Sequence, residues 1–296
     1  MESSQVRLSG SRHTCKLIND MVATGLKRAN PASSQGYVTV TKSRAPSSVR
    51  SRPAPKSRNL LLAALPQDEY DRLRPMLEIV SVKSRQVLSG PGDPPRHVYF
   101  PRGGFLSSTI VMENGTMVEV ATIGREGMAG LATKWPAGAA PTNTLVVAQA
   151  HSEGCYRMTA EDFRREMDEC EAFMELITLY GEAFLGVVMQ STGCNAAHGV
   201  EQRLAKWLLL AHDRMEATEF PLTQEFVAMM LGATRQTVTV VAGEMQKAGF
   251  ITYQRGKIRI VDRKGLEAAS CECYRVSANL LRTAVARRPG AKARAK

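Results

Sequence analysis

The stretch PLTQEFVAMMLGATRQTVTVVAGEMQKAG, residues 221–249, decides how the C-terminal part of this 296-residue chain folds. Thr223 precedes a helix-forming run that Gly232 interrupts, and Thr234 precedes a second run that Gly249 ends. A Thr hydroxyl caps a helix start by accepting a bond from a free backbone N–H, and Gly ends a helix because it tolerates the left-handed conformation. Two short helices around a brief turn form the helix-turn-helix pattern.

The spacing of apolar residues predicts which sides of these two helices face each other. The positions that would pack their small core are Val227, Leu231, Val238, Val241 and Met245. Arg235, Gln236 and Thr239 then face outward near the start of the second helix, the end that meets base edges in the major groove. An Arg can donate two bonds to guanine and a Gln can pair with adenine, while the hydroxyls of Thr234 and Thr237 can bond phosphate. The pattern therefore predicts binding to double-stranded DNA.

Two short strands follow, over residues 250–261, and they are predicted to turn at Arg255 and Gly256 as a wing. Residues 235–264 hold seven Lys and Arg against two acidic residues, so this segment carries a local basic footprint. The alternative is a winged helix that contacts proteins instead of DNA. The predicted DNA contacts are Thr223, Gln224, Thr234, Arg235, Gln236, Thr237, Thr239, Arg255, Lys257 and Arg259.

The net charge of +11 by itself says little about DNA, because most of it lies in the tails. Residues 1–58 hold 11 Lys and Arg against two acids, and residues 282–296 hold six and no acid. Basic tails are often only solvated. Residues 1–57 are also poor in large apolar side chains, so we expect them to be disordered. Whether this segment belongs to the native protein is left open.

Residues 79–158 alternate short β-rich segments with turn signals. The predicted strands are residues 79–82, 87–89, 97–100, 106–112, 117–123, 145–149 and 154–158. Asn114 and Gly115 stand between two apolar strands, which indicates a hairpin because both residues tolerate positive φ. Many short strands at this spacing predict a small antiparallel barrel or roll. Short helices are expected before it, at residues 59–66 and 67–77.

A long helix is predicted from about residue 172 to residue 197, after a short helix that Thr159 caps. Its apolar or small residues recur in steps of four and three, which is a heptad seam. The seam residues are Phe173, Ile177, Tyr180, Phe184, Val187, Ser191 and Cys194. We expect this seam to pair two copies of the chain; the alternative is a helix that packs on its own domain. Residues 193–199 read as a hinge before another amphipathic helix.

This order of parts resembles the Crp/Fnr family of bacterial transcription regulators, from about residue 59 to residue 266. The sharpest matches are RLAKWLL (203–209), LTQEFVAMMLG (222–232), TRQTVT (234–239) and KAGFI (247–251). The resemblance implies DNA binding as a homodimer at inverted repeats, with RNA polymerase as a further partner. It makes Arg235 the base-contacting arginine. Gln236 stands where many members have Glu, and Val240 stands where a cyclic-AMP-binding member has a second reading Arg.

The expected fold is therefore α+β: an N-terminal antiparallel β-roll (a cupin-like double-stranded β-helix), a long dimerisation helix and a C-terminal winged helix-turn-helix. The expected division is a disordered basic tail (1–57), a cyclic-nucleotide-binding-like sensor (58–171), the dimerisation helix and hinge (172–212), the DNA-binding domain (213–281) and a basic tail (282–296).

The sensor departs from the family pattern. GREGMAG (124–130) stands in place of the family's phosphate-cassette turn, but cyclic-nucleotide binders also place an Arg before the strand predicted at 145–149. An ungapped match puts Asn143 and Thr144 there. Without an arginine to neutralise the cyclic phosphate, we expect no cyclic AMP binding of the usual kind. A small-molecule effector is expected at Gly124, Arg125, Glu126, Gly127, Asn143 and Thr144.

The cysteines predict neither a metal nor a cofactor. Cys15 alone near the N-terminus does not match the cysteine cluster of the oxygen-sensing members. Cys271 and Cys273 form a C-x-C pair, which is not the usual zinc spacing. Cys194, on the predicted seam, reads as a packing residue, with a redox switch between subunits as the alternative. Lone histidines such as His97 are weak candidates for a haem ligand.

Other function classes find no support in the sequence. No secretory signal and no run of 18 apolar residues appear, so a cytoplasmic protein without a membrane contact is expected. No phosphate loop, zinc motif or nucleophile elbow appears, so an enzyme is not expected. The remaining alternative to a DNA-binding regulator is a metabolite or nucleotide sensor that acts mainly through protein contacts.

Overall fold

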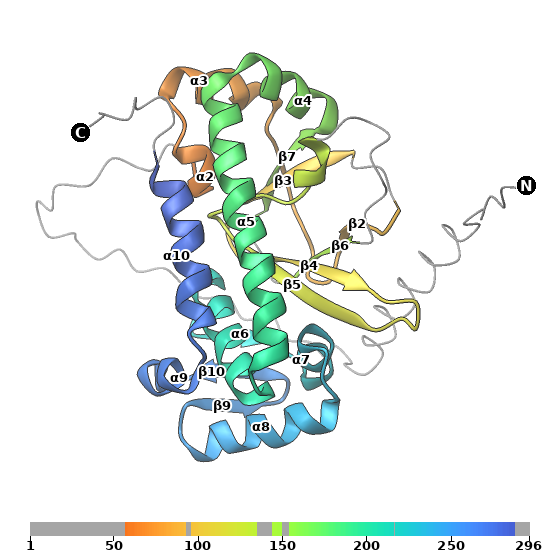
Figure 1. The fold of residues 1–296 in the computed structure, drawn as a ribbon, viewed down its shortest axis with the longest axis vertical. Helices are drawn as coiled ribbons and strands as arrows, with labels where there is room; N and C mark the ends of the chain where they lie inside the picture. The colour runs from red at the N-terminus through yellow and green to blue at the C-terminus, as the bar shows by residue number, and fades with distance from the viewer. Residues whose placement is uncertain (1–56, 93–95, 135–143, 150–153, 216, 288–296) are drawn as a thin grey trace, which may run out of the picture. The chain divides into compact units, whose positions relative to one another are not determined.

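The computed structural model combines antiparallel sheets, a long helix and a winged helix-turn-helix, which confirms the expected α+β class (Figure 1). The predicted tail over residues 1–57 lies outside the described residues, apart from Ser57, which is buried. The described residues are 57–92, 96–134, 144–149, 154–215 and 217–287.

Two antiparallel sheets form the roll, with strand orders β1-β7-β3 and β2-β6-β4-β5. The strands are β1 (Glu78–Val80), β2 (Val87–Ser89), β3 (His97–Pro101), β4 (Leu106–Val111), β5 (Met117–Ile123), β6 (Thr144–Ala148) and β7 (Cys155–Thr159). Each predicted strand of the roll is present, with bounds within two residues. The β4–β5 hairpin turns where expected, but of Asn114 and Gly115 only the glycine has positive φ, at 82°.

The chain enters the roll through α2 (Leu60–Ala63), α3 (Gln67–Leu73) and the 3-10 turn η1 (Arg74–Met76). Asn59 is fully buried and ties this entry to the roll. Its side-chain oxygen accepts from the Leu62 N–H at 3.0 Å, and its amide nitrogen donates to the Pro101 and Gly127 carbonyls at 3.0 and 2.9 Å. A second 3-10 turn, η2 (Leu131–Lys134), follows β5.

The long helix α5 (Glu171–Ala197) follows α4 (Ala160–Glu169), which Thr159 caps as expected by accepting from the Asp162 N–H at 3.0 Å. α5 is long and apolar enough to cross a membrane by length and composition. Phe173, Ile177 and Tyr180, however, are at most 1% exposed in the core that the roll shares with α5, so the helix packs as a core helix does.

After α5 the chain forms α6 (Val200–Met215) and then the winged helix-turn-helix: β8 (Glu219–Pro221), α7 (Gln224–Leu231), α8 (Arg235–Lys247), β9 (Ile251–Gln254) and β10 (Lys257–Ile260). The wing strands pair as β8-β10-β9, so the wing has one more strand than the sequence indicated. Leu204, Trp207 and Leu208 of α6 are buried in the same core as the helix-turn-helix pair.

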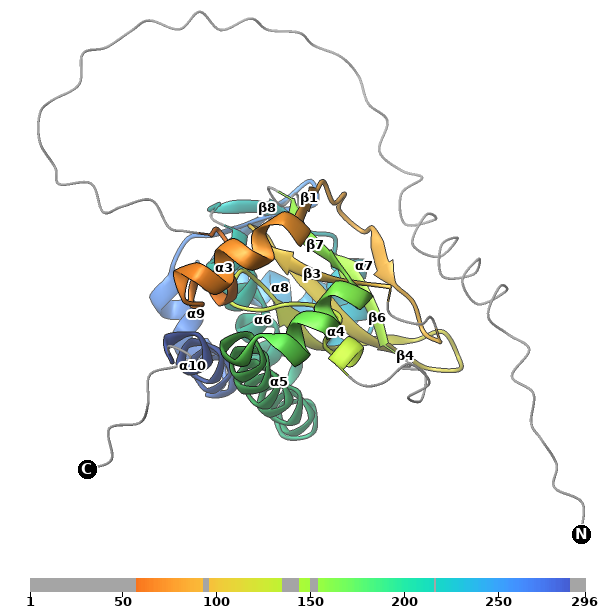
Figure 2. The ribbon, with the colours of Figure 1, turned by 90° about the horizontal axis from the view of Figure 1, so that it is seen from above.

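Two helices at the C-terminus were not foreseen, α9 (Arg263–Ala269) and α10 (Cys273–Ala286). α10 extends five residues into the segment expected to be a tail at 282–296. It lies side by side with α5, which both views show, and Leu280 contacts α5 at Gly186 (Figure 2). Leu281 and Ala284 of α10 are buried in the core that contains the inner face of α5.

The predicted dimer seam is therefore the inner face of α5, the face that points into the chain's own core. Of its seven residues, five are less than 10% exposed within the chain itself: Phe173, Ile177, Tyr180, Val187 and Cys194. Phe184 and Ser191 are partly buried. The alternative weighed for this seam, packing on the chain's own core, is what the structure shows. The roll and α4 cover part of this face, where Phe173 packs on Phe163 and the Tyr180 hydroxyl donates to the Met128 carbonyl, and α10 also packs against it.

Candidate nucleic-acid interface

The two helices of the helix-turn-helix bend by 109° at the break between them, within the range typical of that motif. Gly232 makes the break, with φ of 58° and ψ of 39° at the end of α7. The caps are those the sequence predicts. Thr223 accepts from the Phe226 N–H at 3.3 Å, and Thr234 accepts from the Thr237 N–H at 3.1 Å.

The start of α8 presents an exposed polar tip. Arg235, Gln236 and Thr239 are all exposed, while Val238 and Val241 turn inward and are less than 10% exposed. The apolar core of the pair is as predicted, because Val227, Leu231 and Met245 are also buried. The exposed Thr239 also has partners within the chain, since its hydroxyl donates to Gln224 Oε1 and to the Arg235 carbonyl, both at 2.8 Å. Thr239 and Gln224 thus brace α8 against α7.

The wing carries the three predicted cations, and each of them is exposed. Arg255 lies at the tip, in the left-handed conformation with φ of 50°. Lys257 and Arg259 lie on β10 and both pair with Glu219 of β8, at 3.3 and 2.9 Å. The hydrogen bonds from Arg259 and then Lys257 lower the pKa of the Glu219 carboxyl. No sequence signal marked Glu219 as part of the wing, where its carboxylate offsets part of the positive charge.

A residue of the roll also reaches the predicted interface. The Arg85 Nη2 atom lies 3.4 Å from the Thr223 hydroxyl, and its guanidinium lies over the Phe226 ring, 5.7 Å from the centroid. Arg85 has a φ of 65°, which a non-glycine residue adopts only when its surroundings hold it. No sequence pattern marks Arg85, because its contact depends on how the roll meets α7.

The interface segment matches a known family. Residues 202–269 match the family described as the Crp-like helix-turn-helix domain. This segment is a Crp-like helix-turn-helix domain. Over 78 residues the chain is also 35% identical to the transcriptional regulator SdrP of Thermus thermophilus. That alignment covers 24% of this chain and 39% of SdrP, so the chain is matched to less than half of that relative's length.

Solved structures extend the likeness from the Crp-like domain to the roll. A Crp/Fnr-family regulator from Eubacterium rectale has a TM-score of 0.57 at 19% identity, covering 71% of this chain and 96% of that one. A CRP-family regulator from Thermus thermophilus has a TM-score of 0.56 at 14% identity, covering 65% and 96%. The c-di-GMP-responsive regulator CLP of Xanthomonas campestris has 0.55 at 13%, covering 67% and 100%. At these identities the likeness shows the fold, which is that of Crp/Fnr regulators.

The turn expected to bind an effector faces the Crp-like domain. Glu126 Oε1 accepts from Arg214 Nε at 2.8 Å and from Arg214 Nη2 at 2.6 Å, and Arg214 of α6 is only 8% exposed. A Cβ at Gly124 would lie 2.6 Å from the Arg214 side chain, and one at Gly127 would lie 2.6 Å from the Tyr180 hydroxyl. Because the two glycines lack a Cβ, side chains of α6 and α5 can pack closely against this turn, Arg214 at Gly124 and Tyr180 at Gly127.

A second polar contact joins the roll to the Crp-like domain. The indole N–H of Trp207 on α6 donates to Glu119 Oε1 on β5 at 2.9 Å, and the Ser107 hydroxyl donates to the other carboxylate oxygen. Removal from water raises the pKa of the Glu119 carboxyl to about 7, although the bonds from Ser107 and Trp207 act in the opposite direction. Neither Glu119 nor Arg214 has a sequence pattern that marks it.

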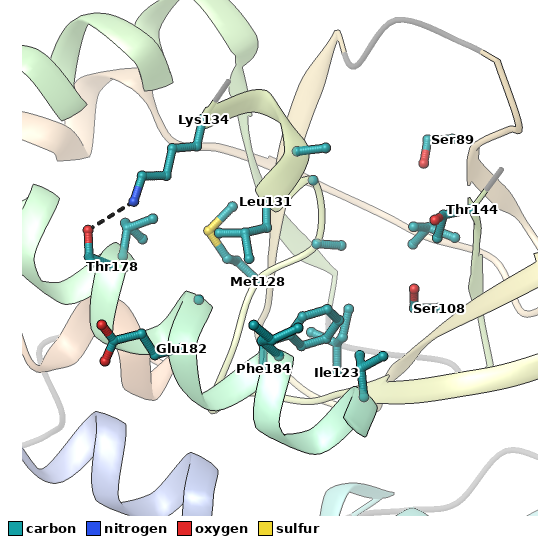
Figure 3. A pocket seen from close by; sticks show the side chains of 18 of the residues that line it. Ser89, Ser108, Ile123, Met128, Leu131, Lys134, Thr144, Thr178, Glu182 and Phe184 are labelled. Carbon is teal, nitrogen blue, oxygen red and sulfur yellow. Dashed lines mark hydrogen bonds between the residues drawn. The ribbon is translucent and has the colours of Figure 1, made fainter. Parts of the chain in front are cut away.

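The roll and α5 enclose a cavity of about 530 Å³ (Figure 3). The hydroxyl groups of Ser89, Ser108 and Thr144 lie on one side of it, and the side chains of Lys134, Thr178 and Glu182 lie on the other. Between them are the apolar side chains of Ile123, Met128, Leu131 and Phe184. Among the described lining residues Lys134 is the one cation, and its ammonium donates to the Thr178 hydroxyl at 3.1 Å.

Of the six residues expected to bind an effector, Thr144 lines this cavity, and Gly124, Arg125, Glu126 and Gly127 do not. Asn143 lies outside the described residues. The turn nevertheless borders the cavity, because Met128, Ala129 and Gly130 of the same GREGMAG segment (124–130) line it. The pairing of Glu126 with Arg214 directs the first part of the turn, residues 124–127, toward α6.

Proposed function

We propose that this chain is a sequence-specific DNA-binding transcription regulator of the Crp/Fnr type. The observation that supports this most directly is the exposed tip of α8, where Arg235 and Gln236 project from the second helix of a Crp-like domain. The N-terminal end of such a helix enters the major groove, where Arg reads guanine and Gln reads adenine. The hydroxyls of Thr223 and Thr234, both exposed at helix starts, would contact phosphate.

The regulator would bind an inverted repeat as a homodimer. The predicted seam is buried within the chain, so the contact between two copies would use a neighbouring stripe of α5. Each residue of that stripe follows a seam residue by one position. The stripe displaced by one residue contains Met174, Leu185 and Val188, and Met189 lies beside it. Met174, Leu185 and Met189 are 42%, 59% and 67% exposed, which is unusual for large apolar side chains of one helix. RNA polymerase would be a further partner of the DNA-bound dimer.

The effector would be a small, mainly apolar molecule held in the cavity between the roll and α5. A cyclic nucleotide needs a cation at its phosphate, and the described lining offers only Lys134, already bonded to Thr178. Bound effector would touch Leu185 and Val188, which belong to the proposed dimer stripe. This shared helix gives a physical route from the cavity to the dimer, with the Glu126–Arg214 and Glu119–Trp207 contacts as a second route to the Crp-like domain.

Footprinting of the purified full chain on genomic DNA fragments tests the DNA-binding proposal. We expect protection of a palindrome whose half-sites lie about one helical turn apart. The variant Arg235→Ala should lose about 1–3 kcal/mol of operator affinity, with relaxed base preference at one position of each half-site. Arg275→Ala, an exposed arginine of α10, is the control and should bind as the parent does. Salt-sensitive binding without a preferred site would instead favour a sensor that acts through protein contacts.

Fluorescence of Nile red, an uncharged apolar probe, tests the effector proposal. We expect its emission to rise with the full chain and to stay unchanged when cyclic AMP is added. Gly181→Phe should remove this signal, because Gly181 lines the cavity and a Cβ there already contacts Leu131 at 3.5 Å. Gly193→Phe on the same helix is the matched control, since a Cβ there meets open space. Competition by cyclic AMP would contradict the proposal.

A further inference from the structure

Four potential metal ligands meet where α5, α6 and α10 come together. Cys194 lies in the last turn of α5 and His198 follows that helix, while Cys271 lies between α9 and α10 and Cys273 is the first residue of α10. Their three sulfur atoms and one ring nitrogen all lie within 4.8 Å of one another. This is a Cys₃His set, one of the donor combinations that structural zinc sites use.

The separations match one tetrahedral ion better than any direct bond between the side chains. Cys194 Sγ and Cys271 Sγ are 3.6 Å apart, and Cys273 Sγ and His198 Nδ1 are also 3.6 Å apart. With zinc–sulfur bonds of about 2.3 Å and zinc–nitrogen bonds of about 2.0 Å, tetrahedral geometry places two sulfurs ~3.8 Å apart and a sulfur ~3.5 Å from a nitrogen. A disulfide would instead need two sulfurs at about 2.05 Å.

The neighbours of the cluster are those that support a metal site. The Lys206 ammonium lies 3.4 Å from Cys194 Sγ, and the Gln190 amide donates to Cys273 Sγ at 3.1 Å. The other ring nitrogen of His198, Nε2, lies 3.4 Å from Glu272 Oε2. A carboxylate that accepts from the second nitrogen of a ligating His fixes the tautomer and raises the basicity of the ligand.

Burial and charge agree with this reading. The three cysteines are at most 3% exposed, so a bound ion would be closed off from solvent as in structural sites. Three thiolates around a doubly charged cation leave one negative charge, and the Lys206 ammonium beside Cys194 offsets it. Each thiol that becomes a ligand releases its proton to solvent, because the thiolate is the form that binds metal.

We propose that Cys194, His198, Cys271 and Cys273 bind one Zn²⁺ ion. Cys271 and Cys273 lie after the residues 202–269 that match the Crp-like domain, and Cys194 and His198 lie before them, so all four ligands are outside the matched segment. The ion would fasten the start of α10 to the end of α5 and to the α5–α6 junction. It would thereby fix where the Crp-like domain leaves the long helix.

The expectation from the sequence was the opposite, namely no metal. The pair Cys271 and Cys273 has the wrong spacing for the usual zinc motifs, and Cys194 is separated from Cys271 by 77 positions. Only the packing of α10 beside α5 brings the four ligands together. Cys194 is fully buried within the chain, so its thiol is not exposed for a redox contact between two copies.

Metal content of the purified full chain tests the proposal. Protein prepared with reductant and without chelator should contain about one zinc per chain by mass spectrometry of metals. Replacement by Co²⁺ should give the intense visible absorption of tetrahedral cobalt with thiolate charge-transfer bands. Cys273→Ser and His198→Gln should lose most of the zinc and the cobalt spectrum. Cys170→Ser, a buried cysteine outside the cluster, is the matched control and should keep both.

A second variant keeps the test valid if Cys273→Ser fails to fold. Glu272 is an exposed residue whose carboxylate touches only His198 in the cluster, so Glu272→Gln should fold normally. In competition with a chromophoric chelator this variant should bind zinc 10- to 100-fold more weakly than the parent. Lack of zinc uptake by the reduced chain loaded with zinc chloride would overturn the proposal. So would equal zinc content in Cys273→Ser and Cys170→Ser, or peptide mapping that finds a stable Cys194–Cys271 disulfide after reduction and zinc loading.

Discussion

The indole N–H of Trp207 donates to the Glu119 carboxylate at 2.9 Å, so a helix of the Crp-like domain is hydrogen-bonded to a strand of the roll. Trp207 is 3% exposed and also packs edge-on against Phe105 of the roll and Phe226 of α7. One side chain thus belongs to the core of the Crp-like domain while it contacts the roll. A change in the charge of Glu119 would be felt directly at that contact.

Glu119 should make the stability of the chain depend on pH. Its folded-state pKa, about 7, lies above its ordinary value of 4.5, so the folded protein favours the protonated form. The stability this gives is fully present below pH 4.5 and is lost as the pH rises to about 7. Glu119→Gln mimics the protonated acid and should gain on the order of 2 kcal/mol over the parent from pH 5 to pH 8. Urea unfolding of both proteins at the two pH values measures this; a constant difference would contradict the raised pKa.

The pair of Arg214 and Glu126 should be strongly coupled. Arg214 is 8% exposed and Glu126 is 19% exposed, so either residue without the other leaves a poorly solvated charge. Because breaking such a pair costs about 3–5 kcal/mol, we expect Arg214→Met to destabilise the chain by about 3 kcal/mol. The double variant with Glu126→Gln should recover part of that loss. Unfolding measurements on the parent, both single variants and the double variant give the coupling, and additive losses would argue against it.

Glu219 should limit how strongly the wing attracts DNA. It pairs with both Lys257 and Arg259, which would otherwise face phosphate with their full charge. Glu219→Gln should therefore bind DNA of any sequence more tightly and give a steeper dependence of log affinity on log salt concentration. Measurements of DNA affinity between roughly 50 and 200 mM salt test this, because counterion release dominates the affinity in that range. Glu267→Gln, an acid of α9 that pairs with Arg263, is a suitable control and should leave the slope unchanged.

The two faces of α5 should respond differently to substitution. Met189→Glu on the outward face should shift the chain toward monomer in sedimentation velocity and weaken operator binding, with little change in unfolding, because Met189 is 67% exposed. Phe173→Ala on the inward face should cost about 3–5 kcal/mol in unfolding, because Phe173 is fully buried. If Phe173→Ala instead shifted the chain toward monomer and Met189→Glu changed only its unfolding, the dimer contact would be the seam predicted from the sequence.

Local sequence signals determined most of the fold. The helix starts at Thr159, Thr223 and Thr234, the break at Gly232 and the strands of the roll were all predictable, because a cap or a glycine acts on backbone within a few residues of itself. The exposed tip with Arg235 and Gln236 follows from the same signals, since the apolar spacing of one helix fixes which side faces out. That part of the candidate interface needed no tertiary information.

Tertiary structure alone decided which surfaces were free and which distant groups met. A heptad seam on α5 shows that one face is buried, but it does not say whether a second copy or the chain's own roll and α10 bury it. The contacts of Glu126 with Arg214 and of Glu119 with Trp207 each join residues 88 positions apart, and a sequence pattern carries no signal over that distance. The same holds for the cluster of Cys194, His198, Cys271 and Cys273. Side-chain chemistry is readable residue by residue, whereas a site exists only where packing brings the side chains together.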